Sequence, residues 1–509
     1  MINSKGNRKF GSLFFNGFVM KKYRILFVCG MVCLAGSVWG QTFEEYKKRV
    51  WQDFEKYKTE EWRKFKEYRD KVNAEFAEYM RRPWTKREAE PPIPVPDRPK
   101  PPKPVVKDPN RQPTYEPLPF DGVTPVPRIE PVPQPKMPLP DIVIPQKRPK
   151  FSFMFYGTPC GVSLAEEHRF TLKGTDENSV ADVWKQLASD KYLPVFAECM
   201  AWRTKLRLCD WGYVRFVERL TEAFFPAEQQ NEARLLQMYI LTQSGYKVRI
   251  ARTREQLALL LPSKEEIYKY SYLNLNDEKY YVIDTSLCKR SFHVFEREFP
   301  EEQFFSLQIP THPLLDFLPS EPQRLTSQRY PDLSVEISVN RNLIDFYDDY
   351  PQSNAWNVYV QASLDENVKE ELYPALRKAI TGKNKPEAAR ILIDFVQTAF
   401  EYQTDNEQFG GERALFADET FYYPYSDCED RAILYSVLVR ELLGLEVVLL
   451  HYPGHLATAV CFGEEVPGDY FTLEGRRYVV CDPTYIHADI GKSMPQYKTT
   501  KADIIRVNN

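Results

Sequence analysis

The sequence predicts an α+β protein in which two similar globular units follow a long helix and a proline-rich linker. Three observations support this prediction. Aromatic side chains recur every eleven positions over residues 42–85, about half of the 40 prolines lie between residues 91 and 149, and the composition turns globular from Phe151 onward. With 43% apolar residues in a chain of 509, there is enough material for the cores of two or three domains.

The first element is a segment typical of export. A basic pair follows Met20, and an apolar run then ends at Trp39, with a cleavage point after Gly40. The run is shorter than the about 20 apolar residues that a membrane span needs. We therefore expect residues 1–40 to be a signal peptide, with Met20 as an alternative start. The mature protein would be periplasmic, in the cell envelope or secreted, without a transmembrane span; an uncleaved N-terminal anchor is the alternative.

The net charge and the number of cysteines indicate which partners and which thiol chemistry to expect. The net charge is −3 with both signs intermixed, which gives no reason to expect a nucleic-acid partner. Removal of the signal would leave an odd number of cysteines, so an exported chain would keep at least one unpaired thiol, and Cys428 is our candidate. No CxxC pair occurs, and we expect neither a metal site nor a cofactor. The seven remaining cysteines are Cys160, Cys199, Cys209, Cys288, Cys428, Cys461 and Cys481.

The second element is the aromatic repeat, for which we predict a helix over residues 41–88. Eleven residues over three turns correspond to 3.67 residues per turn, which gives a nearly straight aromatic stripe. Such a stripe favours packing on itself or on a partner helix, as in a coiled coil, and a membrane or cell-wall surface is the alternative. The repeat consists of Phe43, Phe54, Phe65 and Phe76, followed in step by Tyr46, Tyr57, Tyr68 and Tyr79, with a third column of Trp51 and Trp62 that Asn73 breaks.

The third element, residues 89–149, is predicted to be an extended linker. Proline at this density disfavours helix and sheet and favours a semi-rigid left-handed backbone. We interpret the stretch as a spacer, and recognition of a PxxP motif by a partner is the weaker alternative.

Two globular stretches, residues 150–325 and 326–509, are similar to each other. When Gly245 is aligned with Gly444, RLLQMYILTQSGYKVRIA lies beside RAILYSVLVRELLGLEVVLL, and YYVIDTS later parallels YVVCDPT. We predict two copies of one α+β unit, and two unrelated α+β domains are the alternative.

The second copy carries a possible nucleophile, base and acid in order along the chain. Asp427 is a good N-cap and Gly444 a good C-terminal residue, so Cys428 should begin a helix, where unpaired N–H groups favour a thiolate. His455 should begin a strand, and Asp482 should end another. A thiol, an imidazole and a carboxylate in this order can form a cysteine nucleophile, its base and the group that orients the base. His451 is a second candidate for the base.

The motifs DCEDRA, GHLATAV and VVCDPTY, within about residues 390–500, resemble the transglutaminase-like superfamily. The resemblance implies a papain-like α+β core, with Cys428 as nucleophile, His455 as base and Asp482 as orienting acid. Ala457 stands where many relatives have an aromatic residue. In the first copy the equivalent positions are Gln229 (or a neighbour), Gln256 and Asp284, so that copy would be catalytically degenerate.

About 25 residues before Cys428 have no counterpart in the first copy. Gly410-Gly411 and several aromatic residues predict an ordered flap that lines a cleft. The oxyanion would be stabilised by the backbone N–H of Cys428 and one side-chain donor, for which Gln403 and Gln408 are candidates.

Together these features predict an exported cysteine peptidase or amidase that acts on a protein or peptide through a thioester. A transamidating, cross-linking enzyme is one alternative, although no DxDxDG calcium loop supports it. The other is a non-catalytic cell-envelope scaffold, in which residues 41–88 bind the partner.

Overall fold

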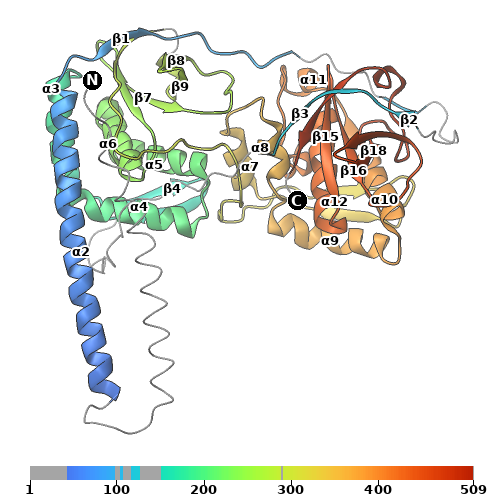
Figure 1. Ribbon diagram of the computed structural model, residues 1–509, viewed down its shortest axis with the longest axis horizontal. Helices are drawn as coiled ribbons and strands as arrows, with labels where there is room; N and C mark the ends of the chain where they lie inside the picture. Colours follow the sequence, from blue (N-terminus) through green and yellow to red (C-terminus); the bar gives the residue numbers. More distant parts are fainter. Residues whose placement is uncertain (1–42, 98–103, 107–115, 127–150, 288–289, 508–509) are drawn as a thin grey trace. The chain divides into compact units, whose positions relative to one another are not determined.

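The structure is a computed structural model that describes residues 43–97, 104–106, 116–126, 151–287 and 290–507 (Figure 1). It is a mixture of helices and mainly antiparallel sheets, as the sequence predicts. The chain divides into two compact units, residues 1–67 and 68–509. Residues 1–40, including the predicted signal peptide and Met20, lie outside the described ranges. Within those ranges, no helix has both the length and the apolar character needed to cross a membrane.

The aromatic repeat forms one helix, α2 (Phe43–Met80). It ends eight residues before the predicted boundary because Pro83 lacks the N–H that a continuing helix needs. Near its end, Phe76 and Met80 are buried. Asn73, which breaks the tryptophan column, is also buried and accepts a hydrogen bond from the indole N–H of Trp184 at 3.1 Å. The interruption of the repeat therefore has a specific polar partner.

The first globular part contains a six-stranded sheet in the order β1-β10-β6-β7-β9-β8. Its strands are β1 (Thr85–Glu88), β6 (Arg249–Arg252), β7 (Leu257–Pro262), β8 (Tyr272–Leu275), β9 (Glu278–Val282) and β10 (Ser291–Phe295). The helices of this part are α3 (Glu177–Leu187), α4 (Leu193–Lys205), α5 (Asp210–Phe224) and α6 (Gln230–Gln243), and a hairpin is formed by β4 (Phe151–Phe155) and β5 (Thr158–Val162).

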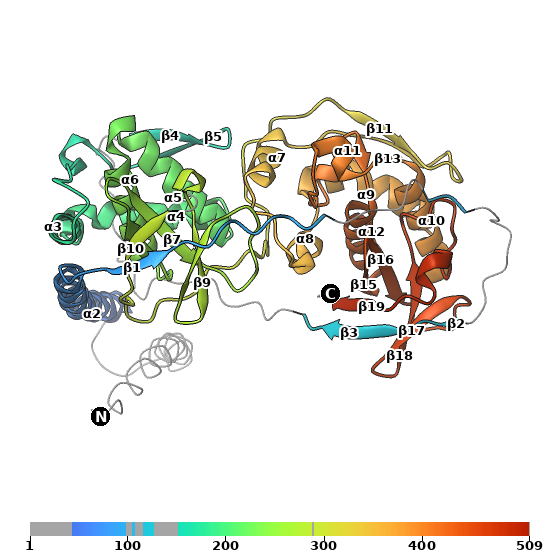
Figure 2. The same cartoon turned by 90° about the horizontal axis from the view of Figure 1, so that it is seen from above.

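The second globular part contains a seven-stranded sheet in the order β2-β17-β18-β16-β15-β19-β3. The helix α12 (Cys428–Leu443) packs against its central strands β15 and β16 (Figure 2). The strands are β2 (Glu116–Pro117), β3 (Phe120–Thr124), β15 (Glu446–Tyr452), β16 (His455–Cys461), β17 (Asp469–Leu473), β18 (Arg476–Cys481) and β19 (Ala502–Arg506). The other helices are α7 (Arg341–Asp348), α8 (Trp356–Gln361), α9 (Glu366–Ile380), α10 (Lys385–Thr398) and α11 (Asp405–Phe409), and the short pairs are β11 (Gln323–Thr326) with β12 (Ser334–Ile337) and β13 (Glu401–Tyr402) with β14 (Tyr425–Ser426).

The proline-rich stretch does more than the predicted spacer would do, because two of its segments are strands of this sheet. β2 pairs in parallel with β17 at one edge, and β3 pairs in parallel with β19 at the other. Only Leu118 and Pro119 separate the two strands, so the sheet must curl until its edges approach each other. Residues 116–124, which we call the strap, therefore join the two edges of one curled sheet.

The strap also completes a second apolar cluster on the sheet face opposite α12. Side chains alternate between the two faces of a strand, so Val447 and Leu449 belong to the main core while Val448 and Leu450 belong to the second cluster. Leu118 of the strap is buried in the second cluster.

Five strands have the same order in the two large sheets, β10-β6-β7-β9-β8 in the first and β19-β15-β16-β18-β17 in the second, and their central pairs share a register. In the first, Arg249 pairs with Leu260, and Leu260 pairs with Val282. In the second, the corresponding pairs are Val448 with Ala459 and Ala459 with Val480.

Candidate active site

His455 and Asp482 lie against each other at the ends of neighbouring strands. His455 begins β16, and Asp482 directly follows β18. Nε2 of His455 is 2.9 Å from Oδ2 of Asp482, and the two residues are 3% and 2% exposed. Oδ1 of Asp482 accepts hydrogen bonds from the backbone N–H groups of Thr484 and Tyr485, at 3.0 and 3.2 Å. Backbone donors on one oxygen thus leave the other oxygen for the imidazole.

The second ring nitrogen of His455 is the one left for chemistry. A carboxylate only accepts hydrogen bonds, so Nε2 must carry the hydrogen that points at Asp482. In the neutral ring, Nδ1 is then an acceptor. Nδ1 is buried and has no hydrogen-bond partner among the described residues. The histidine therefore has one nitrogen held by an acid and one basic nitrogen available.

Cys428 is the first residue of α12 and is 1% exposed. Its helix packs against β16, the strand that His455 begins. The Sγ atom lies 3.0 Å from Oε2 of Glu429, so a neighbouring carboxylate opposes formation of the thiolate. The cysteine and histidine thus occupy a helix start and a strand start in adjacent elements, as the sequence predicts.

Tyr497 joins these groups, and the sequence analysis did not identify it. Its ring stacks on that of His455, with centroids 4.9 Å apart and an interplanar angle of 14°. Burial, together with the smaller effect of negative charge at Cys428 and Asp482, raises the pKa of Tyr497 to about 12. Tyr497 also stacks on Tyr452 at 4.8 Å. Tyr497 therefore interacts electrostatically with both Cys428 and Asp482.

Arg431 fixes the start of α12. Its fully buried guanidinium donates to Oγ of Ser426 at 3.1 Å, to the carbonyl of Gln397 at 3.1 Å and to the carbonyl of Phe400 at 2.9 Å. Burial lowers the pKa of Arg431 to about 10. These contacts attach the helix that carries Cys428 to the end of α10.

Gln397 holds the segment that follows β18. Its amide nitrogen donates to the carbonyls of Asp482 and Ala488, at 3.0 and 3.1 Å, and its oxygen accepts from the N–H of His487 at 3.1 Å. The sequence signal was a glutamine within the apolar run LIDFVQTAF. Such a residue must find polar partners when it is buried, but the run alone does not say which.

The two oxyanion candidates and the second candidate for the base have the following surroundings. Gln408 binds the backbone of Tyr425 in both directions, with Nε2 3.4 Å from the carbonyl and Oε1 3.1 Å from the N–H. Its amide therefore holds the segment that precedes Cys428. Gln403 is half-buried beside β13. His451, the second candidate for the base, lies against the ring of Trp356 at 5.9 Å.

Buried carboxylates surround the start of α12. They form three overlapping groups whose possible ligand atoms lie within 4.8 Å of one another, and these are the described residues that could hold a cation. Carboxylates in the first turn of a helix are also stabilised by its unpaired N–H groups, so the cluster has a structural role without an ion. The groups are Asp427, Cys428 and Glu429; Asp405, Asp427 and Asp430; and Asp405, Glu412 and Glu429.

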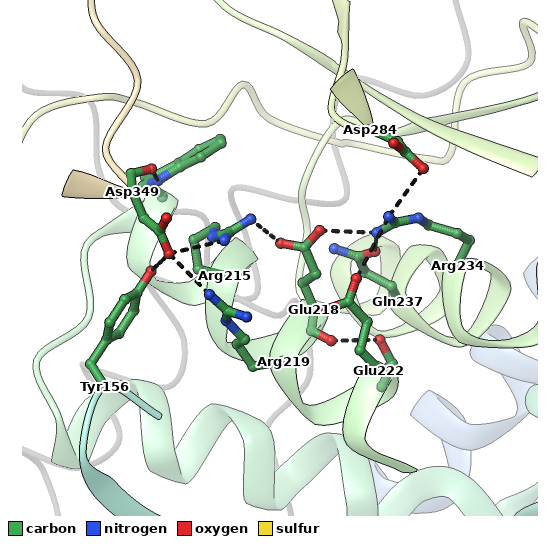
Figure 3. Close-up of polar contacts among 11 residues, drawn as sticks. Tyr156, Arg215, Glu218, Arg219, Glu222, Arg234, Gln237, Asp284 and Asp349 are labelled. Carbon is green, nitrogen blue, oxygen red and sulfur yellow. Dashed lines mark hydrogen bonds and ion pairs between the residues drawn. The ribbon is translucent and has the colours of Figure 1, made fainter. Parts of the chain in front are cut away.

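The first sheet carries different chemistry at the corresponding positions. Gln229 precedes α6, Gln256 precedes β7, and Asp284 follows β9. Asp284 lies 3.4 Å from Arg234, which also binds Glu218 at 3.0 Å (Figure 3). The acid there is thus part of an arginine–carboxylate network, and no histidine among the described residues hydrogen-bonds to it.

Comparison of the chain with family models, with curated proteins and with solved structures gives no match. We therefore infer the function from the geometry of the site.

Proposed function

We propose that the chain is an exported cysteine enzyme of transglutaminase-like type, most simply a peptidase or amidase. The observation that carries this proposal is the buried contact of 2.9 Å between His455 and Asp482, beside the helix that Cys428 begins. An imidazole that is oriented by an acid and has one available nitrogen is the base that a cysteine nucleophile requires.

The proposed reaction has two stages. Nδ1 of His455 takes the proton of Cys428, and the sulfur attacks the carbonyl carbon of the substrate amide. Asp482 stabilises the resulting imidazolium. The backbone N–H of Cys428 is one of the first N–H groups of α12, which have no acceptor within the helix, so it can donate to the oxyanion. The imidazolium returns the proton to the leaving amine as the carbon–nitrogen bond breaks, and a thioester remains.

In the second stage, His455 takes a proton from water, which attacks the thioester carbon. The carbon–sulfur bond breaks, the acid product leaves, and the proton returns to the thiol. An amine in place of water would give transamidation, so the acceptor decides between the two reactions.

We also propose that the two globular parts are copies of one unit. The shared order of five strands and the matching registers of their central pairs support this proposal. The alignment that pairs Arg249 with Val448 also pairs Gln256 with His455. In the first copy, the position of the proposed orienting acid would then hold Asp284, which forms an ion pair with Arg234 and has no catalytic role.

Selective alkylation of Cys428 in the full chain tests the enzyme proposal. Iodoacetamide labelling of Cys428 at pH 6–7, read by peptide mass spectrometry, should depend on His455, whereas labelling of Cys461, the half-buried described cysteine, should not. His455→Ala should slow labelling of Cys428 by about tenfold or more, since the base contributes about 10²–10⁴ to such steps. Peptide hydrolysis should disappear in Cys428→Ala. Labelling that is slow and indifferent to His455 would refute the proposal.

A further inference from the structure

The proposed catalytic residues are closed off from solvent. Cys428, His455 and Asp482 are 1%, 3% and 2% exposed. A peptide cannot reach a thiol in this state. Part of the fold must therefore move before the proposed reaction can occur, and the contacts of the site indicate which part.

The segment 495–501 contacts the site through Tyr497. Its tyrosine, Tyr497, stacks on His455 and is itself half-buried. The next residue, Lys498, binds Asp469 at 3.0 Å and Glu116 at 2.7 Å. The segment is not part of a helix of the main core, and its regular structure is one helical turn, Pro495–Tyr497.

The strap binds the segment 495–501 at two of its lysines. Glu116 pairs with Lys498, and Asp121 pairs with Lys501 at 2.7 Å. The backbone N–H of Leu118 donates to the carbonyl of Tyr470 at 2.8 Å. Leu118 is buried in the second apolar cluster, against which Tyr497 is also packed. The strap and the segment over the site thus share one core and two ion pairs.

We propose that residues 495–501 are a removable cover of the Cys428 site and that the strap of the proline-rich stretch holds this cover closed. The proposal rests on the proposed function for the purpose of the site, but the covering itself concerns only access to a thiol. It gives the proline-rich stretch a regulatory role, because displacement of residues 116–124 would take Glu116 from Lys498 and Asp121 from Lys501 together and leave Lys498 paired only with Asp469.

The strength of the contacts fits a cover that opens. Lys498 and Glu116 are about one third and one half exposed, at 32% and 49%, and the side chains of Lys501 and Asp121 are both 59% exposed. Exposed pairs of this kind contribute little individually. The strap therefore holds the cover through two exposed ion pairs, which a competing partner for the strap can replace, while Lys498 keeps the buried carboxylate of Asp469 as a further partner.

Alkylation of Cys428 in the full chain measures how often the cover opens. The double variant E116Q/D121N removes both carboxylates from exposed positions and should raise the labelling rate about threefold or more. Tyr497→Ala should raise it by about tenfold, whereas Tyr497→Phe, which keeps the stacked ring, should label like the wild type. Glu366→Gln is the matched control, because it removes a lysine partner on α9 at 3.2 Å, away from the strap. The urea midpoint of each variant separates opening of the cover from general loss of stability.

Two results would overturn the proposal. One is labelling of E116Q/D121N and Tyr497→Ala that stays within about twofold of Glu366→Gln. The other is faster labelling that follows a lowered urea midpoint equally in all variants. If instead the cover variants label faster while His455→Ala changes nothing, the cover stands and the enzyme proposal fails. If His455→Ala slows labelling and the cover variants do not change it, the enzyme proposal stands alone.

Discussion

Replacement of Asp482 by asparagine is a demanding test of the site, because it changes the chemistry with almost no change in shape. The N–H groups of Thr484 and Tyr485 point at Oδ1, at 3.0 and 3.2 Å. An asparagine must place its oxygen there to satisfy them, so its NH₂ group faces Nε2 of His455. Because that NH₂ group only donates, Nε2 must become the acceptor and Nδ1 must carry the hydrogen. The nitrogen that should receive the proton of Cys428 is then blocked.

The size of the effect follows from the contact that is lost. A hydrogen bond to a charged group contributes about 1.5–3 kcal/mol, which corresponds to about 10- to 150-fold in rate. We expect iodoacetamide labelling of Cys428 at pH 6 to fall by at least about tenfold in Asp482→Asn.

The control is Asp489→Asn, the same substitution in the same segment. Asp489 binds Arg390 at 2.9 Å, and no hydrogen bond or ion pair to His455 is recorded for it. Its variant should label like the wild type at every pH. Equal rates for Asp482→Asn and the wild type at pH 6 would refute the assignment of His455 as the base and of Asp482 as its orienting acid.

Three further predictions concern stability, measured by urea unfolding. Gln397→Leu leaves one N–H and two carbonyls without a partner and should lower the free energy of unfolding by about 2–3 kcal/mol. The same change at Gln408 should lower it by less than about 1 kcal/mol. Equal losses would contradict the role of Gln397 in holding the segment after β18. Arg431→Met should lower the free energy of unfolding by about 3 kcal/mol. Arg390→Met, which removes an ion pair whose side chains are about one third exposed, should lower it by less than about 1 kcal/mol. No loss of stability in Arg431→Met would contradict the anchoring role of Arg431. Burial raises the pKa of Asp418 to about 6, so its ionisation in the unfolded chain lowers stability as the pH rises from about 4 to 7. Asp418→Asn should therefore gain about 3 kcal/mol relative to the wild type between those pH values, and a difference that does not change with pH would contradict this.

The local part of the site could be predicted from the sequence. Helix α12 begins at Cys428 and ends before Gly444, whose φ of 61° is the left-handed conformation that glycine adopts at a helix end. The strands that start at His455 and end before Asp482 were visible as apolar runs with polar ends. These features depend on residues close together in the chain, so local patterns are enough to indicate them.

The long-range part could not be predicted. Prolines disfavour central strands, and the strap uses only the sheet edges, where a missing N–H is tolerated. Nothing in residues 116–124 indicates that their partners lie after residue 468. Tyr497 likewise sits in a polar segment without periodicity, and its role comes from stacking on a ring 42 residues earlier (497 − 455). Partner choice at such separations is decided by the whole fold.

The strap has a consequence for how the molecule is made. Glu116 leaves the ribosome long before Lys498, its partner 382 positions later, so the curled sheet cannot finish forming until translation is almost complete. Contacts of such sequence separation make folding slow. A shortened chain that begins at residue 150 would present two raw sheet edges, at β17 and β19, and raw edges promote aggregation. Recombinant work on the second globular part should therefore retain the chain from upstream of residue 116.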